Sequence, residues 1–141
     1  MQHGVLRTRD GGRSWAVVSQ GLTGTDVRAL AIDPTDSRIL YASIESGGLY
    51  KSTDGADHWQ QGGAGMNPQT SVHAIVIDPT NPQTLYAGDF NTGVYRSENG
   101  GRLWTQINLG LRTRSVQDLA IASDGSTLYA ATGGEGVFRL D

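Results

Sequence analysis

Three acidic residues, Glu45, Asp89 and Glu135, recur in the same kind of glycine-containing turn along the 141-residue chain. Turns of one type gather on one rim of a repeat protein, so these carboxylates could form an acidic patch that binds sugar hydroxyls or a cation. A glycosidase needs two carboxylates roughly 5 to 10 Å apart across the bound sugar. The alternative is that all three are solvated loop charges, and the sequence leaves both interpretations open.

Phe90 and two residues at the starts of apolar segments complete the set of candidate binding residues. Phe90 stands in GDFNTG, where an exposed ring could stack on a sugar or a partner, or fold back onto its own sheet. His73 aligns with Arg28 at the start of a repeated apolar segment, where a side chain is expected to line a central channel. The histidines lack a metal-ligand spacing such as i, i+2 or i, i+4, so we predict no metal site and no cofactor.

A basic residue also recurs after the same apolar position of each repeat. Arginine binds carboxylates bidentately, which is one interpretation of this pattern. A residue that recurs in every repeat is explained more simply as a solvated strand face paired with neighbouring carboxylates. These residues are Arg7, Lys51, Arg96 and Arg139.

An eight-residue phrase occurs three times, as TRDGGRSW, STDGADHW and SENGGRLW. A hydroxyl and a carboxylate or amide two residues later can accept hydrogen bonds from backbone N–H groups of a tight turn, and glycine supplies positive φ without steric cost. The closing tryptophan can cover the turn with apolar surface while its N–H finds a partner. We predict a structural role for Thr8, Asp10, Gly12, Trp15, Ser52, Asp54, Trp59, Ser97, Asn99, Gly101 and Trp104.

The spacing of these phrases identifies a repeat array, because the tryptophans are 44 and 45 residues apart. The two complete units contain an apolar run, Val27–Ile32 or Val72–Ile77, that Asp-Pro ends, then a segment like TLYAG, a segment like GVYRS, and a strand that begins at the tryptophan. Four strands of about five or six residues with short turns fill the length of one β-propeller blade. We therefore predict an all-β fold of about three four-stranded antiparallel blades, divided as partial blade 1–24, blade 25–68, blade 69–112 and partial blade 113–141.

The phrases resemble the Asp-box, or bacterial neuraminidase repeat, whose pattern is close to Ser/Thr-x-Asp-x-Gly-x-x-Trp. With the companion segments AIDPT and LYAG, the chain is similar over nearly its whole length to the propellers of secreted xyloglucanases and of photosystem II assembly factors. The resemblance implies that the boxes are fold elements away from any active site. It also implies a secreted or periplasmic location, although no signal peptide is recognised in the sequence.

Composition and blade count set the expected partners. A net charge of −3 gives no broad positive field for nucleic acid, no apolar run is long enough to cross a membrane, and no cysteine is present for thiol chemistry. Propellers close with about four to eight blades, so we predict that two copies form a six-bladed ring by strand exchange. The predicted function is a non-catalytic scaffold for a carbohydrate or protein ligand. The alternative is a fragment of a xyloglucanase-like glycoside hydrolase that acts on polysaccharide.

Overall fold

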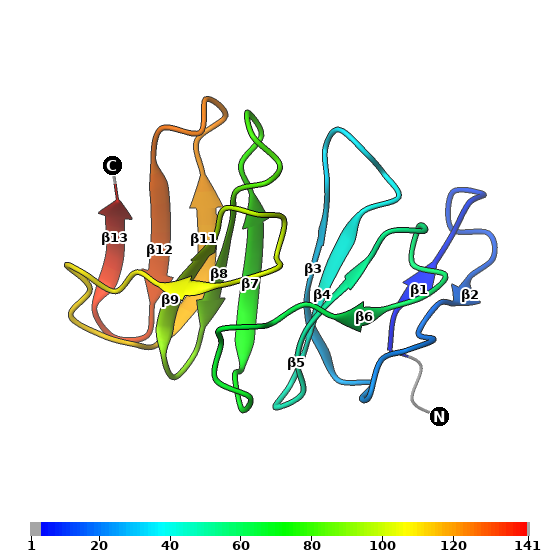
Figure 1. Cartoon of the computed structure of the whole chain (residues 1–141), viewed down its shortest axis with the longest axis horizontal. Coiled ribbons are helices and arrows are strands. Elements are labelled where there is room, and N and C mark those ends of the chain that lie inside the picture. The colour runs from blue at the N-terminus through cyan, green and yellow to red at the C-terminus, as the bar shows by residue number, and fades with distance from the viewer. Residues whose placement is uncertain (1–3, 141) are drawn as a thin grey trace.

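The computed structural model describes residues 4–140. These residues form thirteen strands and no helix, so the predicted all-β propeller architecture is confirmed. The strands form four antiparallel sheets that follow one another in chain order, from β1–β2 at one end of the molecule to β11–β13 at the other (Figure 1).

Two sheets have four strands, one has three and one has two. The two-stranded sheet contains β1 (Leu6–Arg7) and β2 (Ala16–Val17). The first four-stranded sheet contains β3 (Val27–Ile32), β4 (Leu40–Ile44), β5 (Gly48–Ser52) and β6 (Gln60–Gln61). The second contains β7 (Val72–Ile77), β8 (Leu85–Asp89), β9 (Gly93–Ser97) and β10 (Thr105–Gln106). The three-stranded sheet contains β11 (Val116–Ile121), β12 (Leu128–Thr132) and β13 (Gly136–Leu140).

The first strands of successive sheets lie next to one another, with β7 between β3 and β11. Each of these strands begins at a valine and stops after six residues, and in β3 and β7 the next two residues are Asp-Pro. Proline lacks the N–H that a strand ladder needs, so the chain turns there. The sheets are therefore stacked around the line along which β3, β7 and β11 run.

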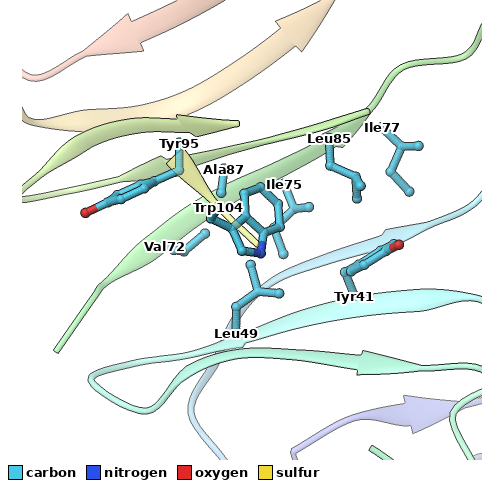
Figure 2. Close-up of a cluster of buried hydrophobic side chains, with 9 residues drawn as sticks. All are labelled: Tyr41, Leu49, Val72, Ile75, Ile77, Leu85, Ala87, Tyr95 and Trp104. Carbon is cyan, nitrogen blue, oxygen red and sulfur yellow. The ribbon is translucent and has the colours of Figure 1, made fainter. Parts of the chain in front are cut away.

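Apolar side chains from adjacent sheets form the core between them. Trp104 is 2% exposed and packs against Leu49 of the preceding sheet and Val72 of its own (Figure 2). Trp59 is equally buried and lies with Val5 and Val18 of the two-stranded sheet. Burial of so large a side chain supplies much of the free energy that holds one sheet on the next.

The second and third repeated turns are fastened to the preceding sheet by the same hydrogen bonds. The indole N–H of Trp104 donates to the carbonyl of Gly62 (2.7 Å), and its backbone N–H donates to Ala64 (2.8 Å). The ammonium of Lys51 donates to the carbonyl of Gly100 (2.8 Å). One sheet earlier, the same contacts join Trp59 to Val18, Trp59 to Gln20, and Arg7 to Gly55. Two of the recurring basic residues thus hold turn carbonyls; Arg7 also pairs with Asp57.

The sequence analysis was wrong about the burial of Trp15 and about the fourth strands. Trp15 is 59% exposed, because no sheet precedes β1–β2 among the described residues. The fourth strands have only two residues each and begin after the tryptophan. The backbone N–H groups of Trp59 and Trp104 bond to the preceding sheet's loop and not to their own ladder.

Candidate functional site

An irregularity in the first strand of each sheet places the candidate channel residues. The pairing register shifts between Val27 and Ala29 in β3, and at the equivalent place in β7 and β11. The extra residues at these bulges are Arg28, His73 and Gln117. A bulge redirects the side chain that it carries and often lies beside a functional site.

Five of the six candidate binding residues lie around Ser71, which precedes β7 and is 5% exposed. The Ser71 hydroxyl donates to the carboxylate of Glu45 (2.7 Å), across the junction between two sheets. The same Glu45 oxygen accepts from Arg28 Nε (3.0 Å) and lies 3.9 Å from His73 Nε2. Arg28 also reaches Asp26 (3.3 Å). We call Arg28, Glu45, Ser71, His73 and Phe90 the rim cluster.

Phe90 and His73 form the aromatic part of the rim cluster. Their ring centroids are 5.2 Å apart with an interplanar angle of 24°, so the rings are stacked. Phe90 remains 40% exposed, and its backbone N–H donates to the carbonyl of Ser71 (2.9 Å). A ring that stacks on His73 through one face, on a backbone that is itself anchored, loses little entropy when a ligand covers its other face.

Asp89 lies beneath the rim cluster and holds its backbone. It is the last residue of β8 and is fully buried. Its carboxylate accepts hydrogen bonds from the backbone N–H groups of Ser71, Asn91 and Thr92, and from the Thr92 hydroxyl. All of these donors belong to the two loops that meet at the rim, so the Asp89 carboxylate has no surface on which a ligand could bind.

A hollow of about 410 Å³ lies beside the rim cluster, between the first four-stranded sheet and the loop that joins β6 to β7. It is lined by neutral residues, among them Leu49, Met66 and Asn67. Thr70 also lines it and is 2% exposed, and its hydroxyl has no hydrogen-bond partner in the structure. A buried hydroxyl without a partner costs free energy, and a ligand that bonded to it would recover that cost.

Glu135 does not join the cluster. It is exposed in the turn between β12 and β13, on the sheet beyond His73. Conversely, the sequence analysis missed Ser71 and Thr70, which complete the site. A repeat-based signal was available for Ser71, because a polar residue, Asp26 or Ser115, also precedes the first strand of the neighbouring sheets.

The rim cluster has the residue types of a serine–histidine–acid triad but a different geometry. In a triad the acid bonds to the histidine nitrogen that faces away from the serine. Here Glu45 bonds to the Ser71 hydroxyl itself and approaches the same His73 nitrogen, Nε2, that lies 3.3 Å from that hydroxyl. The arrangement can therefore bind and orient polar groups, but it does not activate Ser71 as a nucleophile. Within residues 4–140, no three His, Asp or Glu side chains are placed to share a metal ion.

The three repeated turns have one hydrogen-bond pattern. In the first turn the backbone N–H of Gly12 donates to the Thr8 hydroxyl (2.9 Å), and that of Ser14 donates to Asp10 (2.9 Å). The second and third turns repeat both bonds, with Ser52 and Asp54, and with Ser97 and Asn99, as acceptors. The hydrogen bonds from Ser14 lower the pKa of Asp10 to about 2, and those from His58 do the same for Asp54.

Known proteins resemble the chain in sequence and in fold. A family model described as Sortilin, neurotensin receptor 3, matches residues 3–136. The chain belongs to the Sortilin-Vps10 family. No curated protein matches this Sortilin-Vps10 chain in sequence.

Solved structures give the same fold for this Sortilin-Vps10 chain. A GH74 enzyme from Niastella koreensis is 29% identical over 96% of the chain, with a TM-score of 0.77. An ancestral GH74 enzyme is 23% identical over 98% of it (TM-score 0.80), and YCF48 from Cyanidioschyzon merolae is 14% identical over 98% (TM-score 0.71). The chain spans 24%, 20% and 44% of these three proteins, respectively. The resemblance to such propellers is thus confirmed.

Residues 4–140 contain no helix with the length and hydropathy needed to cross a membrane.

Proposed function

We propose that this chain is a non-catalytic propeller scaffold that binds a carbohydrate at the rim cluster. The observation that carries the proposal is the meeting of Glu45, His73 and Phe90 around Ser71, at the junction of two sheets. A half-exposed aromatic ring offers a platform for the apolar face of a sugar. The Glu45 carboxylate and the Arg28 guanidinium, with side chains 31% and 45% exposed, offer an acceptor and a donor for its hydroxyls.

The hollow beside the rim cluster supports the same ligand class. Its neutral lining suits an uncharged ligand. Asp89 supports a binding role in place of a catalytic one. It is buried under backbone N–H donors, so it cannot act with Glu45 as the second carboxylate of a glycosidase pair, and the exposed carboxylate of Asp26 is paired with Arg28.

Binding is tested by titrating the protein with cello-oligosaccharides and xyloglucan oligosaccharides, using calorimetry and NMR shifts. We expect binding that the Phe90→Ala and Glu45→Gln variants each weaken by at least about tenfold, because a lost stacked ring or charged hydrogen bond is worth more than about 1.4 kcal/mol. Glu135→Gln is the matched control, since it removes an exposed carboxylate from an equivalent turn. Equal loss in the control, or no shift at the rim cluster, contradicts the proposal.

The second candidate function is a segment of a polysaccharide-hydrolysing enzyme of the GH74 kind. It is favoured by the 29% identity to the Niastella koreensis GH74 enzyme. Release of reducing ends from xyloglucan tests it. Turnover by the folded wild-type chain that is absent from a heat-denatured sample would replace the scaffold proposal with this one.

We also propose that two copies self-associate through strand exchange and so complete the ring of blades. Exposed apolar side chains on the first and last sheets support this part of the proposal, including Leu6 (44%), Val17 (56%) and Val137 (70%). The solution mass tests it, with twice the 15.0 kDa chain mass expected.

A further inference from the structure

The last sheet junction has a surface like the one that surrounds Trp104. We call Val94, Leu111, Leu128, Ala130 and Phe138 the receiving surface; they line one apolar pocket between β9 and β13. By the repeat alignment, they occupy the positions of the residues that surround Trp104, namely Leu49, Met66, Leu85, Ala87 and Tyr95. Among the described residues, no tryptophan lies in this pocket.

A glycine marks where a tryptophan backbone fits at this junction. Gly21 and Gly65 both have positive φ, and a Cβ on either would overlap the carbonyl oxygen of Trp59 or Trp104, respectively. Gly110 is their equivalent and also has a positive φ, +87°. A Cβ added to Gly110, however, would have no other atom within 4 Å. Its conformation is therefore that of a site over which a repeated turn would pass.

A basic residue at the same junction lacks a turn to hold. Arg7 and Lys51 donate to the carbonyls of Gly55 and Gly100 in the turn of the next sheet. Their equivalent, Arg96, has a buried Nε without a hydrogen-bond partner, while its NH2 group pairs with Glu98 (2.6 Å). Arg96, Gly110 and the receiving surface together fit one ligand, a repeated turn with its tryptophan.

The first turn of the chain is such a ligand. Its internal hydrogen bonds match those of the two packed turns, so it is already folded for packing. Its tryptophan, Trp15, is 59% exposed, and a Cβ added to Gly11 would have no other atom within 4 Å. By contrast, Arg7 and Lys51 approach the equivalent glycines, Gly55 and Gly100.

We infer that the Thr8–Trp15 turn of a second copy of this chain docks on the receiving surface, with Trp15 in the pocket and its carbonyl over Gly110. The inference rests on the self-association in the proposed function and assigns its interface. In the docked state the Gly11 carbonyl accepts from Arg96, and the indole N–H of Trp15 donates to the carbonyl of Ile107, the equivalent of Gly62. A contact of this kind in both directions closes a ring of two chains.

Strand β1 of the second copy replaces β13 in this interface, so Leu6 of the second copy takes the place of Phe138 beside Trp15. The two have nearly the same sequence, Gly4-Val5-Leu6-Arg7 and Gly136-Val137-Phe138-Arg139, so both fit beside β12. β1 is the better anchored strand, because Val5 is 4% exposed in its own core and Arg7 bonds to Gly55. β13 has four exposed residues out of five. Blade completion from two chains then follows the rules of strand addition.

The test measures the dimer dissociation constant by analytical ultracentrifugation over a range of protein concentrations. We expect the constant to rise by at least about 30-fold in Trp15→Ala, because a buried central tryptophan is a typical interface hot spot. Gly110→Ala should have a similar effect, since its Cβ would collide with the incoming carbonyl. Leu103→Ala is the matched control; it removes an exposed apolar side chain (54%) from the third repeated turn and should leave the constant unchanged. A monomeric wild type at all concentrations, or a dimer that survives Trp15→Ala, overturns the inference.

Acrylamide quenching gives a second readout that does not depend on a variant's folding. Trp59 and Trp104 are buried, so in a single subunit the quencher reaches only Trp15 of the three tryptophans. We expect this accessible fraction to disappear as the protein concentration rises, and an accessible fraction that stays constant while the mass doubles excludes the Trp15 interface.

Phe138→Ala tests the strand replacement, because it weakens β13 and should tighten the dimer; weakening would show that β13 stays in place. Failure of sugar binding with these results intact would count against the rim cluster alone.

Discussion

Gly65→Ala should destabilise the fold much more than Gly110→Ala, although the two glycines are equivalent. Both have positive φ, +89° and +87°, so alanine costs about 1 to 2 kcal/mol of backbone strain at either position. Only at Gly65 does the new Cβ overlap the carbonyl oxygen of Trp104. Relief of that overlap disturbs two hydrogen bonds of Trp104, to Gly62 and Ala64, which are worth about 1 kcal/mol each. We therefore expect about 3 to 4 kcal/mol for Gly65→Ala and about 1 to 2 kcal/mol for Gly110→Ala.

Urea unfolding followed by tryptophan fluorescence measures both free energies of unfolding. The experiment is done at low protein concentration, where association contributes nothing, and with far-UV circular dichroism as a second probe of two-state behaviour. Values for the two variants within about 0.5 kcal/mol of each other would refute the reasoning, because they would mean that the turn at Trp104 moves without cost. The whole explanation of sheet stacking by fastened turns would then need revision.

Three further predictions concern the turns and their contacts. The pKa of Asp10 and of Asp54 is about 2, below the ordinary 3.8, so the unfolded chain binds more protons between pH 4 and pH 2, and stability should fall as the pH falls through this range; an Asp10→Asn, Asp54→Asn double variant should show a shallower fall in acid unfolding curves. Burial raises the pKa of Tyr41 to about 12, so spectrophotometric titration should find one tyrosine that ionises late, and Tyr41→Phe should cost only about 1 kcal/mol because Lys51 still bonds to the same turn carbonyl. Trp59→Phe should cost about 1 to 3 kcal/mol in thermal or urea unfolding, because it leaves a buried carbonyl without its indole donor; a smaller loss would mean that water reaches that carbonyl.

Most of the fold could be predicted because the signals that start and end its strands are local in sequence. The bounds expected for β3 and β7 match the structure, since a valine start and an Asp-Pro stop depend only on neighbouring residues. The length of the fourth strands could not be predicted in this way. Nor could the backbone bonds that Trp59 and Trp104 make to the sheet before, because such bonds appear only once the sheets are stacked.

The candidate site was predicted in its members but not in its centre. Glu45, His73 and Phe90 stood out as charged or aromatic residues off the core pattern. Ser71 did not, because a serine before a strand is ordinary, and its importance comes from the Glu45 carboxylate that reaches it from the neighbouring sheet. The sequence analysis placed Asp89 in the loop, whereas the structure makes it the buried end of β8. Composition alone does not distinguish a carboxylate that faces solvent from one that holds two loops together.

Trp59 and Trp104 each belong to one sheet but pack on the sheet before it. Each repeat unit therefore carries both a tryptophan turn and an apolar surface that receives the turn of the next unit. Tandem duplication of one unit lengthens the array without any new contact having to evolve. Loss of one unit leaves a tryptophan turn and an apolar surface that still match. Such a molecule can change its number of blades by recombination, while the polar rim diversifies independently of the joints.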